Sequence, residues 1–206
     1  MVPQDYSYPL PLPSPSQVTE EQVCAHISKL LPYKAPGPDQ IPNIVLQKVV
    51  NHIVSYLLPI YRSIIKHGIY YQGWQESMIC ILQKPGKPSY EVPKAYHPIA
   101  LLCMMAKVLT SIVSENLISI VEQRQLLPDM HFSGRPCRST TDAVHLLIHQ
   151  VKEAWRKGKV VSILFLDIEG AFPNAVTERL LHNMKKRRVP NQIVKFIERL
   201  LNGRTT

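Results

Sequence analysis

The chain has 206 residues, including 18 prolines and 8 glycines, with 45% apolar and 19% charged residues. This length suits one domain with a tail, and the composition predicts a folded chain with its own core rather than a disordered one. The apolar runs are too short to cross a bilayer, and the N-terminus lacks the pattern of a secretory signal. We therefore expect an intracellular protein, nuclear or cytoplasmic, with no membrane partner.

Positive charge gathers towards the C-terminus. Lys and Arg total 24 against 15 Asp and Glu, which gives a net charge of +9. Residues 152–206 hold 12 basic and 5 acidic residues, and the densest run, KKRR, occupies 185–188. This excess indicates a polyanionic partner, although a basic surface that only keeps the protein soluble explains it equally well.

The cysteine and histidine patterns do not favour a zinc site. No two of the four cysteines form a C-x-x-C pair, so we expect reduced thiols rather than a metal or disulfide framework. His145 and His149 are four apart on a predicted helix, but the glutamate of an H-E-x-x-H motif and a third ligand are missing.

The predicted elements begin after a proline-rich lead, residues 1–17, which holds five prolines and is expected to be disordered or polyproline-like. Thr19 and Gln22 have the pattern of a capping box, which predicts a helix that runs to Pro32. A turn-rich loop is predicted over 34–42.

The middle of the chain is predicted to be mainly helical. Two helices are expected over 42–57 and 58–67, followed by a short strand over 78–82. A tight basic turn at 84–89 is expected to form the tip of a hairpin. Apolar residues then recur at helical spacing over 99–121.

The last third of the chain combines helices with one strand. A loop at 131–140 leads to a helix over 140–157, capped by one of its first two threonines. The aliphatic run at 160–168 predicts a strand buried on both faces. Two further helices are predicted over 176–187 and 190–201, and the mixture indicates an α/β or α+β class.

Asp167 is the most informative single residue, because it ends an otherwise apolar strand. An ionised carboxylate there needs compensation, which a divalent metal or a capped turn would supply equally well. Glu169 shares the strand face and could complete a metal pair, although a solvated side chain is the simpler interpretation. Phe172 could line a nucleotide pocket or belong to the core.

Two loops carry paired cations. Lys84 and Lys87 flank the Pro-Gly turn, where their ammonium groups could contact phosphates or simply face solvent. Arg135 and Arg138 lie beside Gly134 and would suit a nucleic-acid backbone. Neither a Walker A loop nor a G-x-G-x-x-G motif is present.

Four segments in order resemble the reverse transcriptase domain of LINE-like (non-LTR) retrotransposons, of fungal type, over about residues 18–206. They are KAPGPDQIPN at 34–43, LQKPGKPSYEVPKAYHPIALL at 82–102, LLPDMHFSGRPCRSTTDAV at 126–144 and FLDIEGAF at 165–172. The resemblance implies a helix-rich α+β fold, a partial right-hand polymerase with a few strands. Its fingers would cover 18–157 and the start of its palm 158–206.

The resemblance also implies site residues. Asp167 would be the catalytic residue that binds both Mg²⁺ ions, the Ile168 carbonyl a further metal contact, and Phe172 the side chain that selects dNTPs. The activity implied is template-directed DNA synthesis by two-metal phosphoryl transfer, with an RNA or DNA template–primer and a dNTP as partners. The two pairs of basic residues would then bind different ligands. Lys84 and Lys87 would bind the nucleotide, and Arg135 and Arg138 the template.

Several departures from the family pattern limit these expectations. His97 stands where the family usually has Arg, Ser133 and Cys137 where Gly is usual, and Pro173 where Asp is common. The later palm motif with its paired aspartates is absent, so we expect the chain, truncated after the FLDIEGAF segment at 165–172, to be inactive alone.

Two other functions remain open at this point. The chain could be a non-catalytic basic module that binds nucleic acid, or a metal-dependent nucleotide-sugar transferase that uses Asp167 and Glu169. In each case the open face and edge of the 160–168 strand predict self-association. A monomeric, cooperatively melting protein would contradict that expectation.

Overall fold

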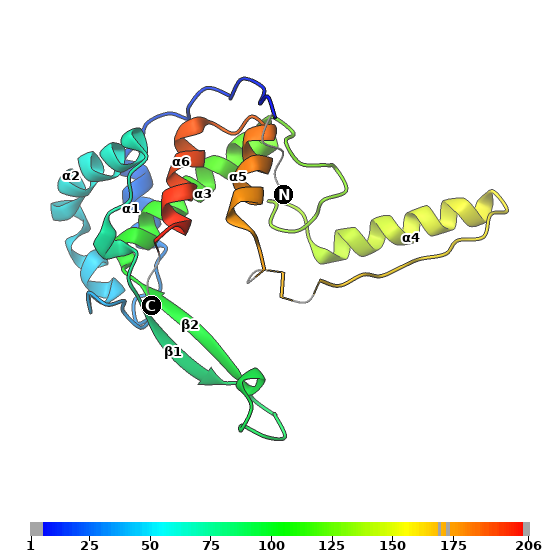
Figure 1. Cartoon of the computed structure of the whole chain (residues 1–206), viewed down its shortest axis with the longest axis horizontal. Helices are drawn as coiled ribbons and strands as arrows, with labels where there is room; N and C mark the ends of the chain where they lie inside the picture. The colour runs from blue at the N-terminus through cyan, green and yellow to red at the C-terminus, as the bar shows by residue number, and fades with distance from the viewer. Residues whose placement is uncertain (1–5, 169, 172–173, 204–206) are drawn as a thin grey trace. The chain divides into compact units, whose positions relative to one another are not determined.

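The computed structural model of the chain describes residues 6–168, 170–171 and 174–203. The chain divides into two compact units, a first unit of Met1–Leu117 with Thr177–Thr206 and a second unit of Ile118–Val176. The described residues are mostly helical and contain one two-stranded sheet (Figure 1). The helix-rich α+β composition with few strands is therefore confirmed.

The first unit contains most of the elements. They are α1 (Glu20–Ser28), α2 (Asn43–His67), β1 (Ser77–Gln83), β2 (Tyr96–Leu102), α5 (Thr177–Lys186) and α6 (Asn191–Leu201). Helix α3 (Met104–Gln123) begins in the first unit and ends in the second, where α4 (Thr140–Arg156) follows. Short 3-10 turns, η1 (Gln72–Trp74) and η2 (Pro93–Ala95), precede the two strands. Helices α5 and α6 confirm the two predicted at the end of the chain.

Helix α1 starts where the sequence predicts it and ends earlier. The Thr19 hydroxyl accepts from the Gln22 N–H (3.3 Å), and the Gln22 side chain accepts from the Thr19 N–H (3.2 Å). This is a complete capping box. The helix stops at Ser28, before Pro32, because the proline ring excludes helical backbone in the turn before it. Leu31 consequently lies outside the helix and is 61% exposed.

Helix α2 is one continuous helix, so the prediction of separate helices over 42–57 and 58–67 is wrong. Pro59 lies inside it and lacks the N–H that would bond to the Ser55 carbonyl. The helix continues because one buried face extends across the proline, formed by Leu46, Val54, Leu57, Tyr61 and Ile64. It ends as predicted at Gly68, whose φ of 61° gives a left-handed cap.

Strands β1 and β2 form an antiparallel hairpin, with Ser77 opposite Leu102 at its base. Strand β1 confirms the strand predicted over 78–82. The helix predicted over 99–121 is wrong at its start, because its first residues belong to β2. Pro98 favours this outcome, since it lacks the N–H of a helix interior but is tolerated in an edge strand.

Aromatic side chains pack α2, α3 and α6 together in the first unit. Tyr61 is fully buried, and its hydroxyl donates to the Met105 carbonyl (2.8 Å). Its ring lies 6.2 Å from that of Trp74, and the Tyr70 ring lies 5.7 Å from that of Phe196. These contacts hold the start of the hairpin, because Trp74 lies three residues before the first residue of β1, Ser77.

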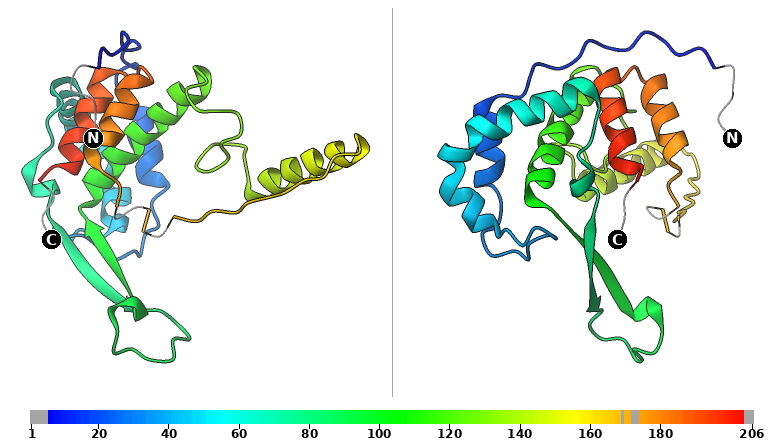
Figure 2. Two further views of the ribbon diagram at one scale, coloured as in Figure 1. Left: turned by 45° about the vertical axis from the view of Figure 1, so that its right-hand side comes forward. Right: turned by 60° about the vertical axis from the view of Figure 1, so that its left-hand side comes forward.

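Residues 6–17 of the proline-rich lead form no helix or strand and run past the ends of α6 and α5 (Figure 2). The Leu12 N–H donates to the Arg188 carbonyl (2.8 Å), and Arg188 Nε donates to the Leu10 carbonyl (2.9 Å). The Tyr8 hydroxyl lies 2.9 Å from His182 Nδ1. These contacts attach the described part of the lead to the first unit.

Ser139 caps α4, so the predicted caps, Thr140 or Thr141, are wrong by one or two positions. The Ser139 hydroxyl accepts from the Asp142 N–H (3.1 Å), and the Asp142 carboxylate accepts from the Ser139 N–H (2.7 Å). The reciprocal pair favours Ser139, because Asp142 stands three residues after it. The helix itself confirms the one predicted over 140–157.

The strand predicted over 160–168 is absent, and this apolar run is extended and exposed. Leu164, Phe165 and Leu166 are 80%, 79% and 84% exposed. A strand needs a neighbour to bond its backbone groups, and β1 and β2 pair only with each other among the described residues. Self-association stays a prediction and now rests on this exposed apolar run rather than on a sheet edge.

Helices α2 and α3 are each long and apolar enough to cross a membrane by length and composition. Uninterrupted apolar runs in the sequence do not predict this, because polar residues interrupt both helices. Core helices of soluble proteins pass the same test, and each of the two buries one face, α2 through residues such as Tyr61 and α3 through residues such as Leu109.

Candidate functional site

Asp167 lies in the second unit, near the end of the exposed apolar run, and its side chain is exposed. Ile168 follows it and is 75% exposed. The other residues predicted for this segment, Glu169, Phe172 and Pro173, lie outside the described residues. The buried, strand-end environment expected for Asp167 is therefore not present in the described chain.

The described residues do not complete a metal centre. No three His, Cys, Asp or Glu side chains gather in the described part of the chain where they could hold a metal ion. Mg²⁺ takes close to six oxygen ligands, and a two-metal site shares carboxylates between two ions. The carboxylate of Asp167 and the carbonyl of Ile168 thus do not fit such a centre by themselves.

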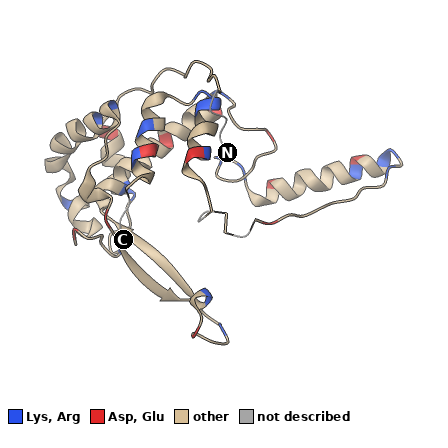
Figure 3. Cartoon of the chain, viewed as in Figure 1, with Lys and Arg blue, Asp and Glu red and all other residues tan. Residues whose placement is uncertain are grey.

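The connection between β1 and β2 carries the lysines predicted to meet the nucleotide. It spans 84–95, longer than the predicted tight turn, because its three prolines cannot donate ladder hydrogen bonds. The Lys84 N–H donates to the Ala95 carbonyl (2.8 Å) and its Nζ to the Lys94 carbonyl (2.9 Å). Lys84 thus closes the connection, while Lys87 is exposed in it, and Figure 3 shows both basic and acidic residues at this end of the hairpin.

Arg135 is buried in the second unit, with its side chain 5% exposed. Its Nε and Nη2 donate to both carboxylate oxygens of Glu122 (2.7 and 2.8 Å), and Nη1 donates to the carbonyls of Pro128 (3.0 Å) and His131 (3.4 Å). The hydrogen bond from Arg135 lowers the pKa of Glu122, and that of Arg135 is raised by the same contact. The guanidinium therefore fastens the loop 124–139 to the end of α3.

Arg138 occupies the same loop in a different setting. It is half-buried, donates through Nη1 to the Asp129 carbonyl and lies 5.6 Å from the centroid of the Phe132 ring, a cation–π geometry. The backbone around it turns at Gly134 (φ 68°) and Cys137 (φ 56°). The loop thus buries one predicted template residue and leaves the other half-buried.

Replacing Cys137 by glycine is expected to stabilise the protein. A φ of 56° is unfavourable for any residue with a Cβ, so Cys137→Gly should raise the free energy of unfolding by about 0.5–1 kcal/mol. Cys80→Gly is the matched control, because Cys80 is exposed in β1, where glycine weakens a strand. In urea denaturation, the midpoint should be higher for Cys137→Gly and lower for Cys80→Gly than for the unmodified chain. A lower midpoint for Cys137→Gly would contradict the interpretation.

Gly37 has a structural role that the sequence analysis missed. A Cβ at Gly37 would lie 2.4 Å from the carbonyl carbon of Leu102 and 2.6 Å from the backbone nitrogen of Cys103. Beside it, burial and a hydrogen bond with Asp39 raise the pKa of the Cys103 thiol to about 11. The loop 34–42 therefore packs on the junction of β2 and α3, and the only signal in the sequence is the Pro-Gly-Pro run.

The predicted site residues that the structure describes lie on three segments, the two basic loops and the exposed run 160–168. Lys84 and Lys87 share the β1–β2 connection of the first unit. Arg135 and Arg138 share the loop before α4 in the second unit, which also contains Asp167. The assignment of these residues to nucleotide, template and metal stays a prediction.

Residues 82–206 match the family model described as "Reverse transcriptase (RNA-dependent DNA polymerase)". A probable RNA-directed DNA polymerase from transposon BS of Drosophila melanogaster is 30% identical over 81% of this chain and 18% of its own length. The RNA-directed DNA polymerase from mobile element jockey of Drosophila funebris is 29% identical over 99% of this chain and 22% of its own length.

This chain spans about a fifth of the length of these curated relatives. Their names confirm the resemblance to polymerases of LINE-like retrotransposons, while the fungal type stays a prediction. The family model begins at Leu82 and so includes both basic loops and Asp167. The chain therefore belongs to the reverse transcriptase family.

Proposed function

We propose that this chain is the N-terminal part of an RNA-directed DNA polymerase domain of the right-hand type. The observation that carries the proposal is the family match over 82–206, which includes Lys84, Arg135 and Asp167. The fingers would cover 18–157 and the start of the palm 158–206. The nucleotide-sugar transferase alternative loses its support, because membership of this family accounts for Asp167 without it.

Each exposed site residue has a role within this proposal. Asp167 would provide one carboxylate for Mg²⁺ and the Ile168 carbonyl a further oxygen, the ion supplying charge neutralisation at the transferred phosphoryl group. Lys87 is exposed and would meet the incoming nucleotide, together with Lys84 and Phe172. Arg138 would contact the template backbone, and Arg135 would support it by holding the loop in place.

The 206 residues alone are expected not to extend a primer. The described residues contain no group of three His, Cys, Asp or Glu side chains that could hold a metal ion, and both ions of a two-metal site need shared carboxylates. Primer extension on an RNA template with dNTPs and Mg²⁺ should give no more product than a protein-free control. Incorporation that disappears in Asp167→Ala would contradict this expectation.

Nucleic-acid binding without catalysis is the second candidate function, and the basic C-terminal quarter favours it. Residues 152–206 hold 12 basic and 5 acidic residues, and Lys186 in the KKRR run is exposed. RNA binding by this route should weaken steeply with salt and survive Asp167→Ala. Binding that disappears with Asp167→Ala would instead favour the polymerase site.

A further inference from the structure

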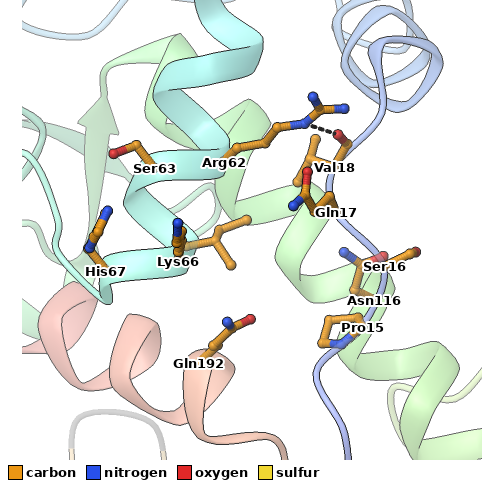
Figure 4. A pocket seen from close by; sticks show the side chains of 11 residues that line it. Pro15, Ser16, Gln17, Val18, Arg62, Ser63, Lys66, His67, Asn116 and Gln192 are labelled. Carbon is orange, nitrogen blue, oxygen red and sulfur yellow. Dashed lines mark hydrogen bonds between the residues drawn. The ribbon is translucent and has the colours of Figure 1, made fainter.

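A pocket of about 390 Å³ lies in the first unit, and none of the residues predicted for a polymerase site is among its lining residues. Figure 4 shows side chains from α2 on one side, the chain around Pro15–Val18 on the other, and Gln192 of α6 at one end. We call it the basic pocket, and its polar lining includes Arg62, Lys66, His67, Asn116 and Gln192. Its volume falls in the range of small-ligand sites.

The charged lining of the basic pocket is entirely cationic. Arg62 and Lys66 both line it, His67 adds an imidazole, and no Asp or Glu is among the lining residues. Two cations in one concave site repel each other in the absence of a counter-charge, so the arrangement favours an anion.

Arg62 is fixed in place by the backbone. Its Nε donates to the carbonyl of Val18 (2.8 Å), and Val18 is 2% exposed. This bond uses one donor on one edge of the guanidinium, and Arg carries four further N–H groups on its two terminal nitrogens. A held guanidinium loses less conformational freedom when it binds a phosphate oxygen than a freely rotating one does.

Neutral donors complete the basic pocket. Asn116 accepts from Gln22 Nε2 through its amide oxygen (3.4 Å), which leaves its amide nitrogen as the group it can offer to a ligand. Gln192 lies in the first turn of α6, and that helix has no side-chain cap at its N-terminus. The Gln192 side chain lines the pocket, and its amide nitrogen is a further neutral donor.

We propose that the basic pocket binds a phosphate group. The combination of a held guanidinium, an ammonium and amide N–H donors matches the several acceptor oxygens of a phosphate better than the two of a carboxylate. The phosphate comes either from a nucleic-acid backbone or from a small phosphate compound. The proposal is independent of polymerase chemistry, because it concerns none of the residues assigned to that site.

Phosphate binding by Lys66 variants tests the proposal directly. Lys66→Gln removes one cation from the pocket, and Lys48→Gln makes the same change at an exposed position elsewhere on α2. The full chain is titrated with inorganic phosphate in a calorimeter. The affinity for phosphate should be about tenfold weaker in Lys66→Gln and unchanged in Lys48→Gln. Equal affinity in both variants, or no phosphate binding by the unmodified chain, would overturn the proposal.

A second arm identifies the source of the phosphate. A labelled single-stranded RNA without terminal phosphates is titrated against the same variants, all carrying Asp167→Ala so that the polymerase site contributes nothing through that carboxylate. Weaker RNA binding in Lys66→Gln, with a salt slope smaller by about 1, identifies a backbone phosphate. RNA binding unchanged by Lys66→Gln, with phosphate binding still weakened, identifies a small phosphate compound.

Discussion

Gly37→Ala is expected to lower the free energy of unfolding by about 3 kcal/mol, because the added methyl group collides with backbone and not with a mobile side chain. The new Cβ would lie 2.4, 2.5 and 2.6 Å from the carbonyl carbon and oxygen of Leu102 and the nitrogen of Cys103. Relief requires the loop 34–42 to move away from the base of the hairpin. The variant should therefore also expose the buried Cys103 to thiol reagents.

Gly86→Ala is the matched control for this prediction. Gly86 lies in the β1–β2 connection with a φ of 72°, and a Cβ there would meet no atom within 4 Å. Only backbone strain remains, which costs about 1 kcal/mol. Urea denaturation of the two variants measures the difference, and a Gly37→Ala midpoint no lower than that of Gly86→Ala would contradict the close packing of the loop.

The elements predicted correctly are those whose signals are local. Thr19 with Gln22 specifies the start of α1 through two hydrogen bonds within three residues. Gly68 specifies the end of α2 through its own left-handed backbone. Such signals can be read from the sequence because all the atoms that interact are close along the chain.

The elements predicted wrongly depend on distant partners. The run 160–168 has the composition of a buried strand, but composition does not supply a neighbouring strand, and the described chain leaves Phe165 79% exposed. Strand β2 was missed because its residues also fit a helical spacing, and pairing with β1 decides between the two structures. Pro98 within that segment was the local signal against a helix.

The candidate site follows the same division. The order of the motifs was enough to identify the family, and the comparisons confirm that interpretation over 82–206. The environment of each side chain could not be predicted, because it depends on contacts such as that of Arg135 with Glu122, which lie on different elements. The sequence predicts the same role for Arg135 and Arg138, and the structure separates a buried arginine from a half-buried one.

Removing Arg135 should release the loop 124–139, and this is the largest effect expected in the second unit. Arg135→Gln leaves Glu122 without its cation and removes the guanidinium donor from the carbonyls of His131 and Pro128, of which the Pro128 carbonyl still accepts from the His131 N–H (3.0 Å). Arg135→Lys should release the loop almost as much, because an ammonium group cannot reproduce the two parallel hydrogen bonds of the guanidinium. We expect amide hydrogen exchange across the loop to accelerate by at least about tenfold in both variants.

Arg156→Gln is the control for that measurement, since Arg156 also pairs with one carboxylate, Glu153, but is 73% exposed. Exposed ion pairs contribute little to stability, so amide hydrogen exchange in the loop 124–139 should not change in Arg156→Gln. Similar exchange rates in Arg135→Gln and the unmodified chain would contradict the fastening role assigned to Arg135.

The pH dependence of the loop tests the same contact without removing the arginine. Because Arg135 lowers the pKa of Glu122 from its ordinary 4.5, the stabilisation is complete above that value and is lost as the pH falls through the lower pKa of the folded state. Exchange across the loop should therefore accelerate as the pH falls below about 4.5, after correction for the intrinsic rate. Glu122→Gln should abolish most of this dependence and leave the part due to Asp142, whose pKa is lowered by its bonds to Ser139. An unchanged acid response in Glu122→Gln would assign the effect to the α4 cap instead.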